Sequence, residues 1–115
     1  MNRVAEKYTA ALKDRVVTPS VPDGFLSSWA QYTILLENRT QRNSVQAKLK
    51  ENGIPSMIYY PRGLHQQAAY KRMQLDDADY PNTAAATQRV LSLPMHPYLE
   101  ENEQQFIINC LLEVL

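Results

Sequence analysis

The sequence predicts an α+β domain, in which helices flank a small and mostly antiparallel sheet. Two observations lead to this prediction. Helical and extended patterns alternate along the chain, in the order helix, strand, helix, strand, helix, strand, helix. The extended patterns are few and short, so we expect a small sheet that helices cover on one face. With 115 residues, the chain is long enough to form one domain with its own core.

A helix and a loop begin the chain. Residues 3–13 carry Val4, Tyr8 and Leu12 at intervals of four, which places these side chains on one face of a helix. The charged residues of this segment fall on its other faces, as in a helix that packs against a core. Residues 18–24 contain two prolines and a glycine, which predict a loop.

A strand and a second helix follow. Residues 28–37 are rich in aromatic and β-branched side chains, which favour a strand. Trp29 and Tyr32 stand at odd spacing in that strand and are therefore expected on opposite faces. Residues 41–51 predict a helix, with Thr40 as its N-cap and an Asn-Gly pair as its stop.

The second half of the chain contains five further elements. Residues 54–60 predict a strand, whose pairing direction the pattern leaves open, and residues 66–71 predict a helical turn. Residues 81–90 predict a helix with a proline in its first turn, and residues 91–93 a short edge strand. Residues 101–114 carry an apolar stripe at helical spacing and predict the last helix.

The composition argues against several classes of function. The formal net charge is zero and the basic residues do not cluster, so we expect neither a nucleic acid nor an anionic membrane as partner. No apolar run approaches the roughly 20 residues of a membrane span. The single cysteine, Cys110, cannot form a disulfide within the chain, which fits a reducing, cytoplasmic location. Two histidines and one cysteine without close spacing do not predict a metal site.

The chain also lacks the usual signatures of a cofactor site. Four of its five lysines fall on the polar sides of predicted helices, as surface charges do. The three glycines are isolated, so no glycine-rich loop is present to bind a phosphate. The residues themselves therefore predict no catalytic and no cofactor-binding group.

Three stretches of the sequence are more specific than its composition. They are Ser28–Ile34, the segment from Gly53-Ile54-Pro55 through Tyr59-Tyr60-Pro61 to Tyr70, and Leu91–Leu99, which reads LSLPMHPYL. In order and spacing they resemble the C-terminal part of the DegT/DnrJ/EryC1/StrS aminotransferases, which are sugar aminotransferases of fold type I. The opening residues, Asn2 to Tyr8, resemble the helix that links the two domains of that family. The resemblance covers nearly the whole chain.

The resemblance implies a fold and a reaction. Residues 1–115 would be the C-terminal small domain of such an enzyme, and the large N-terminal domain would be a missing partner. The whole enzyme would use pyridoxal phosphate, with glutamate as amino donor, to aminate a keto group on a nucleotide-linked sugar. Such sugars enter surface polysaccharides and secondary metabolites, and family members are typically homodimers.

Within this resemblance the chain alone has a limited role. The cofactor and its Schiff-base lysine would belong to the large domain, so we expect the 115-residue chain to hold no cofactor and to be inactive by itself. The alternative is a stand-alone module, derived from this domain, that binds a small molecule or another protein without catalysis.

The candidate site is the loop that follows the strand predicted at residues 54–60. In the family the matching loop faces the sugar, so the resemblance implies substrate-binding residues here. The candidates are Tyr59, Tyr60, Arg62, His65, Gln66 and Gln67. Imidazole and amide groups suit sugar hydroxyls, and a guanidinium suits a diphosphate or a carboxylate. Tyr59 and Tyr60 would end the strand on opposite faces, one toward the core and the other toward the cleft.

Overall fold

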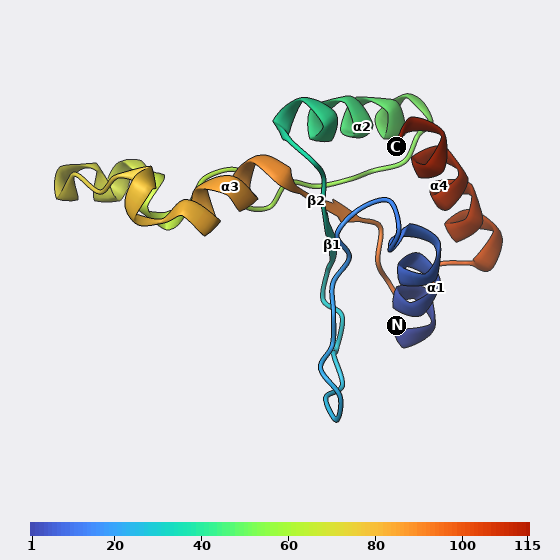
Figure 1. Ribbon diagram of the computed structural model, residues 1–115. Coiled ribbons are helices and arrows are strands. Elements are labelled where there is room, and N and C mark those ends of the chain that lie inside the picture. Colours follow the sequence, from blue (N-terminus) through green and yellow to red (C-terminus); the bar gives the residue numbers. More distant parts are fainter.

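A two-stranded antiparallel sheet lies at the centre of the computed structural model, which describes residues 1–115 (Figure 1). Strand β1 (Tyr32–Leu35) pairs with β2 (Val90–Leu93), so that Tyr32 lies opposite Leu93. Single bridges extend the sheet on both sides, from Val17 to Leu35 and from Met57 to Ser92. The predicted α+β class with a small antiparallel sheet is confirmed.

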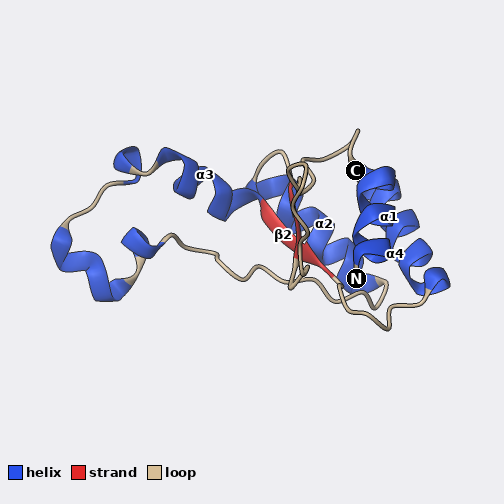
Figure 2. Cartoon of the chain, turned by 90° about the horizontal axis from the view of Figure 1, so that it is seen from below, coloured by secondary structure: helices blue, strands red, loops and turns tan.

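Three helices pack on one face of this sheet. They are α1 (Asn2–Leu12), α2 (Arg39–Glu51) and α4 (Glu101–Val114). Figure 2 shows them gathered on one side of β2, with the fourth helix, α3 (Pro81–Arg89), on the other. None of these helices is both long and apolar enough to cross a membrane.

The core lies between the three helices and the inward face of the sheet. Tyr32 and Ile34 of β1 and Leu91 of β2 are fully buried against apolar residues of the helices. Because side chains alternate along a strand, Thr33 and Ser92 lie on the opposite face. The sheet therefore has one face in the core and one face that is free to form a site.

The four predicted helices are present, within about two residues of their expected ends. The N-cap of α2 differs from the prediction, because the side chain of Asn38 accepts a hydrogen bond from the backbone N–H of Gln41 at 2.8 Å. Asn38 therefore caps the helix two residues before Thr40.

The first strand is much shorter than residues 28–37. Trp29 adopts φ 55°, in the left-handed region, so the extended backbone begins only after it. The ring of Trp29 lies 5.6 Å from that of Tyr32, centroid to centroid, and its indole N–H donates to Asn2 at 2.9 Å. The expectation that these two rings point to opposite faces is wrong, because the backbone turns between them.

The prediction of a strand at residues 54–60 is also wrong. Only Met57 pairs with the sheet, through two backbone hydrogen bonds to Ser92 of 3.0 and 2.8 Å. Pro55 has no N–H to donate, which weakens any longer ladder at this position. Strand β2 lies at the edge of the two-stranded sheet, as the sequence predicted, and only Ser92 also pairs with Met57 on its other side. Short 3₁₀ turns at Leu64–Gln66 and Ala68–Met73 replace the single helical turn expected at 66–71.

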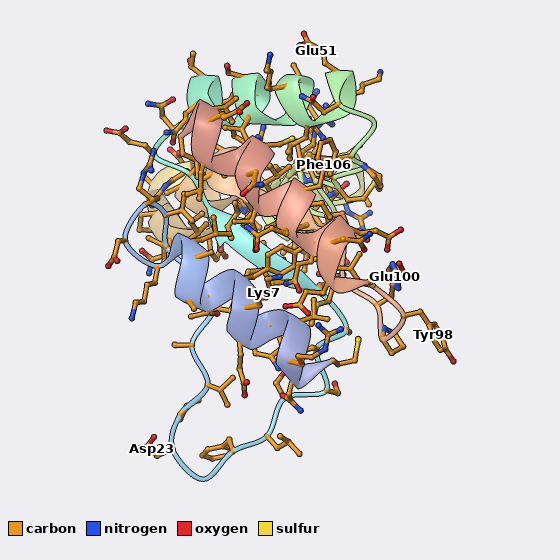
Figure 3. The ribbon with its side chains drawn as sticks, turned by 90° about the vertical axis from the view of Figure 1, so that its right-hand side faces the viewer. Lys7, Asp23, Glu51, Tyr98, Glu100 and Phe106 are labelled. Carbon is orange, nitrogen blue, oxygen red and sulfur yellow. The ribbon has the colours of Figure 1, made fainter.

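Two segments project from the helical body. The loop 18–30 hangs away from it with Asp23 at its tip (Figure 3), and residues 57–89 form a second arm that ends with α3 (Figures 1 and 2). The radius of gyration is 15.5 Å, against about 13 Å for a compact chain of this length. The accessible surface is 7794 Å², against about 6,400 Å² for a folded monomer of 13.2 kDa. The arms account for this extended shape.

Tyr8 joins α1 to the end of the sheet. Its ring is fully buried, its centroid lies 5.0 Å from that of Tyr32, and its hydroxyl donates to the carbonyl of Pro94 at 2.9 Å. Burial, with a smaller contribution from Tyr32, raises the pKa of Tyr8 above its ordinary range. The neutral hydroxyl is therefore the form that the fold requires.

We expect Tyr8→Phe to lower the free energy of unfolding by about 1–3 kcal/mol, because the Pro94 carbonyl loses its partner. Folding raises the pKa of Tyr8, so the wild type should also lose stability as the pH rises above about 10, the unfolded value, and the variant should lose less. Urea denaturation at several pH values measures both effects. Tyr98→Phe is the control, because Tyr98 is 85% exposed and points away from the body (Figure 3). Equal effects of the two substitutions would contradict this role.

Candidate functional site

A cleft of about 320 Å³ opens on the face of the sheet that is turned away from the core. Both strands, helix α3 and the second arm contribute to its walls. The lining residues are Gln31, Thr33, Tyr59, Tyr60, Arg62, Gly63, Leu64, Thr83, Ala86, Thr87, Val90 and Ser92. The cleft is thus built from segments far apart in the sequence.

Two hydroxyl groups lie on the strands that form one side of the cleft. Thr33 Oγ1 and Ser92 Oγ share a hydrogen bond of 2.7 Å across the strand pair. Two hydroxyls carry two donor protons between them, and their mutual bond uses one. One proton and several lone pairs therefore stay available to a ligand. Sequence reasoning missed both residues, although the alternation along β1 already places Thr33 opposite the core-facing Tyr32 and Ile34.

Three of the six candidate residues line the cleft together. Tyr59 is 48% exposed and Tyr60 69% exposed, so neither packs in the core. The expectation that one of them does so is wrong, because no strand forms at 54–60 to divide them between two faces. Arg62 lies beside them and is exposed. The ion pairs of the chain are Lys7–Glu101, Lys48–Glu51 and His65–Asp77, so the Arg62 guanidinium has no carboxylate partner.

His65 lies behind the wall of the cleft and does not line it. Its side chain is 5% exposed, its Nε2 lies 2.8 Å from Oδ1 of Asp77, and its ring packs on Tyr80 with a centroid distance of 4.8 Å. This histidine is a buried, partnered group, and not the solvent-facing loop residue that its sequence context also allowed.

The two glutamines have different environments. Gln66 donates from Nε2 to Oδ1 of Asp77 at 2.8 Å and accepts at Oε1 from the backbone N–H of Gly63, also at 2.8 Å. Gln67 is exposed and lies outside the cleft. The bonds from Gln66, and then from His65, hold the pKa of Asp77 below its usual range. Asp77 was not singled out in the sequence, where nothing marks one acidic residue among the three at 76, 77 and 79.

The cleft does not fit the covalent attachment of a cofactor. None of the five lysines belongs to its lining, so no amine of this chain is placed to form a Schiff base there. No group of three or more His, Cys, Asp or Glu residues is arranged to hold a metal ion. What the cleft offers is aromatic faces, hydroxyl groups and one guanidinium, which suit non-covalent recognition.

Gly63 allows the arm to approach α3 closely. A Cβ at this position would lie 2.6 Å from Cγ2 of Thr83 and 2.8 Å from both Cε1 and Nδ1 of His65. The φ of Gly63 is −67°, which any residue adopts, so the requirement is for space and not for an unusual backbone. Both Gly63 and Thr83 line the cleft, so this contact sets the distance between two of its walls.

We expect Gly63→Ala to push the arm away from α3 and to lower the free energy of unfolding by about 1–3 kcal/mol, as overpacking does. Urea denaturation measures the loss. Adding Thr83→Ser removes the methyl group in the contact and should restore part of the stability. Leu64→Ala, at a neighbouring residue that is 70% exposed, should change it by less than about 0.5 kcal/mol. A double variant no more stable than Gly63→Ala would show that the contact with Thr83 is not the cause.

Comparisons with known proteins match nearly the whole chain. The model of the DegT/DnrJ/EryC1/StrS aminotransferase family matches residues 2–112. A pleiotropic regulatory protein from Geobacillus stearothermophilus is 39% identical over 113 residues, which are 95% of this chain and 30% of that protein. A UDP-2-acetamido-2-deoxy-3-oxo-D-glucuronate aminotransferase from Pseudomonas aeruginosa is 39% identical over 85% of this chain and 26% of its own length.

A solved structure agrees in fold as well as in sequence. The crystal structure of a DegT DnrJ EryC1 StrS aminotransferase from Brucella abortus superposes with a TM-score of 0.87 and 45% identity, over 97% of this chain and 29% of that one. The chain thus spans less than a third of the length of the relatives that it matches.

Proposed function

We propose that this chain, which belongs to the DegT/DnrJ/EryC1/StrS aminotransferase family, is the C-terminal small domain of a longer enzyme. That enzyme would aminate a keto group on a nucleotide-linked sugar. The family is one of sugar aminotransferases, and relatives at 39% and 36% identity are named for UDP-linked amino sugars. The amino donor in this proposal is glutamate. The product would serve the synthesis of a surface polysaccharide or of a secondary metabolite.

The cleft is the observation that carries the proposal. Tyr59 and Tyr60 offer aromatic faces on which the apolar face of a sugar or a nucleotide base packs. The hydroxyls of Thr33 and Ser92 suit sugar hydroxyl groups, and the unpaired guanidinium of Arg62 suits a diphosphate. A nucleotide-linked sugar presents all three kinds of partner in one molecule.

The chain's own contribution would be to shape the sugar pocket and to exclude water from it. Pyridoxal phosphate, when bound, supplies the electron sink for transfer of the amino group. Since no lysine lines the cleft, we assign the cofactor and its lysine to the remainder of a longer polypeptide. His65 and Gln66 would act on the sugar only indirectly, through the loop that they support.

The apolar surface that the two arms expose is evidence for a partner of substantial size. Ten of the fourteen large hydrophobic side chains that are exposed lie on the two arms, residues 18–30 and 57–89. Exposed apolar surface of this extent is characteristic of an interaction site. We propose that these arms pack against the large domain and against a second copy in a cytoplasmic homodimer. Nucleic acid and membrane surfaces are not partners in this proposal.

The alternative is a stand-alone binding module. In that case the aromatic faces, hydroxyl groups and guanidinium of the cleft would bind a small molecule by themselves. The reading frame upstream of Met1 distinguishes the two proposals. Some 250 further residues with a lysine-bearing segment would support the proposal of an aminotransferase, since a second domain of that size is usual. A start codon at Met1 would support the module.

We expect UDP-N-acetylglucosamine, titrated into the ¹⁵N-labelled chain, to shift the amide resonances of Thr33, Tyr60, Arg62 and Ser92 with a Kd in the millimolar range, as for a half-formed site. Arg62→Ala should weaken this binding about tenfold, the usual effect of losing a charged hydrogen bond. Arg72→Ala is the matched control, because Arg72 lies exposed on the same arm but outside the cleft. Equal affinity of both variants, or no shifts at these residues, would contradict the assignment of the cleft.

We also expect the chain to bind pyridoxal phosphate no better than an unrelated protein of similar lysine content. All its lysines lie outside the cleft, and surface amines form only weak, unselective adducts with aldehydes. Absorbance titration, followed by borohydride reduction and peptide mass mapping, measures this. A reduced adduct on one specific lysine would overturn the assignment of the cofactor to another part of the protein.

A further inference from the structure

The cleft wall formed by residues 61–67 has few backbone ties to the rest of the chain. The backbone hydrogen bonds of this loop are local, from Gln66 to Gly63 at 3.0 Å and from Gln67 to Leu64 at 3.2 Å. The last backbone link between this part of the arm and the sheet is the pair formed by Met57 and Ser92. The position of the loop, and of Arg62 within it, therefore depends on side-chain contacts.

Those contacts converge on one carboxylate oxygen. Oδ1 of Asp77 lies 2.8 Å from Nε2 of His65 and 2.8 Å from Nε2 of Gln66. Gln66 in turn holds the backbone N–H of Gly63, the residue after Arg62, at 2.8 Å. A continuous series of hydrogen bonds thus runs from Asp77 through Gln66 to the backbone beside the guanidinium that lines the cleft.

The same aspartate lies on the turn that leads into the opposite wall of the cleft. Asp77 begins a 3₁₀ turn, Asp77–Asp79, that leads directly into α3 at Pro81, and α3 supplies Thr83 and Thr87 to the cleft. A carboxylate that receives two donors from the loop therefore links one wall to the other. Tyr80, the residue directly before α3, also joins the two walls, because its ring packs on that of His65.

We propose that Asp77 is a positioning residue, which holds the loop of residues 61–67 against α3 through His65 and Gln66 and so sets the place of Arg62 in the cleft. The part of this inference that concerns a ligand rests on the proposed function. An ionised carboxylate only accepts hydrogen bonds, so it selects the His65 tautomer that carries its proton on Nε2 and the Gln66 amide orientation with nitrogen toward Asp77. His65 is a supporting group for the wall, since its ring does not belong to the cleft lining.

The test compares Asp77→Ala, Asp77→Asn and Asp79→Ala with the wild type. Asn keeps an acceptor oxygen at the same place without the charge, and Asp79 is an exposed carboxylate on the same turn. Ring ¹⁵N shifts of His65 at pH 8 report its tautomer, and amide hydrogen exchange reports the mobility of residues 61–67. Far-UV circular dichroism and the urea midpoint verify that each variant is folded.

We expect the Nε2–H tautomer in the wild type, in Asp77→Asn and in Asp79→Ala, and a mixture of tautomers in Asp77→Ala. Amide exchange at Arg62–Gln67 should accelerate about tenfold or more in Asp77→Ala alone, because the loop loses its link to α3. An unchanged tautomer and unchanged exchange in Asp77→Ala would overturn the proposal. Faster exchange in Asp79→Ala to the same extent would also overturn it, since the effect would then belong to the turn and not to the hydrogen bonds.

Binding of UDP-N-acetylglucosamine separates this inference from the proposed function. If the wild type binds it, Asp77→Ala should weaken the affinity about tenfold, as loss of a supporting hydrogen bond often does, and Asp77→Asn by less. An equal affinity of Asp77→Ala and wild type would overturn the role in placing Arg62. If the wild type itself does not bind, the proposed function of the cleft fails, while the tautomer and the exchange rates still decide whether Asp77 holds the loop.

Discussion

The pairing of β1 with β2 is the constraint on which the rest of the structure depends. Four residue pairs fix which side chains face the helices and which face the cleft. Tyr32 and Ile34 enter the core, while Thr33 and its hydroxyl partner Ser92 face the other way. A slip of one residue would exchange the two sets, placing hydroxyls in the core and a tyrosine in the cleft. Core packing and site chemistry are therefore specified by the same register.

The body and the arms are stabilised in different ways. In the body, α1, α2 and α4 bury a continuous apolar cluster against the sheet, and the backbone N–H of Gln41 donates a capping bond to the side chain of Asn38 at the start of α2. The second arm buries little apolar surface and relies on side-chain hydrogen bonds around Asp77 and on the close approach at Gly63. We therefore expect the second arm to open more readily than the body.

The residues that line the cleft agree with what the family's chemistry requires of this part of the protein. Amino transfer with pyridoxal phosphate requires a lysine, and the walls of this cleft contain none. Hydroxyl, aromatic and guanidinium groups are what a substrate wall requires. The chain covers less than a third of the length of its relatives, and it exposes more surface than a folded monomer of its mass. Both facts support the proposal that this chain contributes substrate recognition to chemistry carried out elsewhere in a longer protein.

The sequence by itself determined the helices, the α+β class and the family, because helix periodicity and the three linked stretches are local patterns that need no knowledge of distant partners. It also marked Tyr59, Tyr60 and Arg62, which the fold brings to one cleft. Only the tertiary structure decided that residues 54–60 pair at Met57 alone, that His65 turns inward, and that Thr33 meets Ser92 and Asp77 meets His65 and Gln66. The physical reason is that strand pairing and polar clusters join residues distant in sequence, such as Thr33 and Ser92, which are separated by 59 positions. No local pattern records which partner a given side chain will meet.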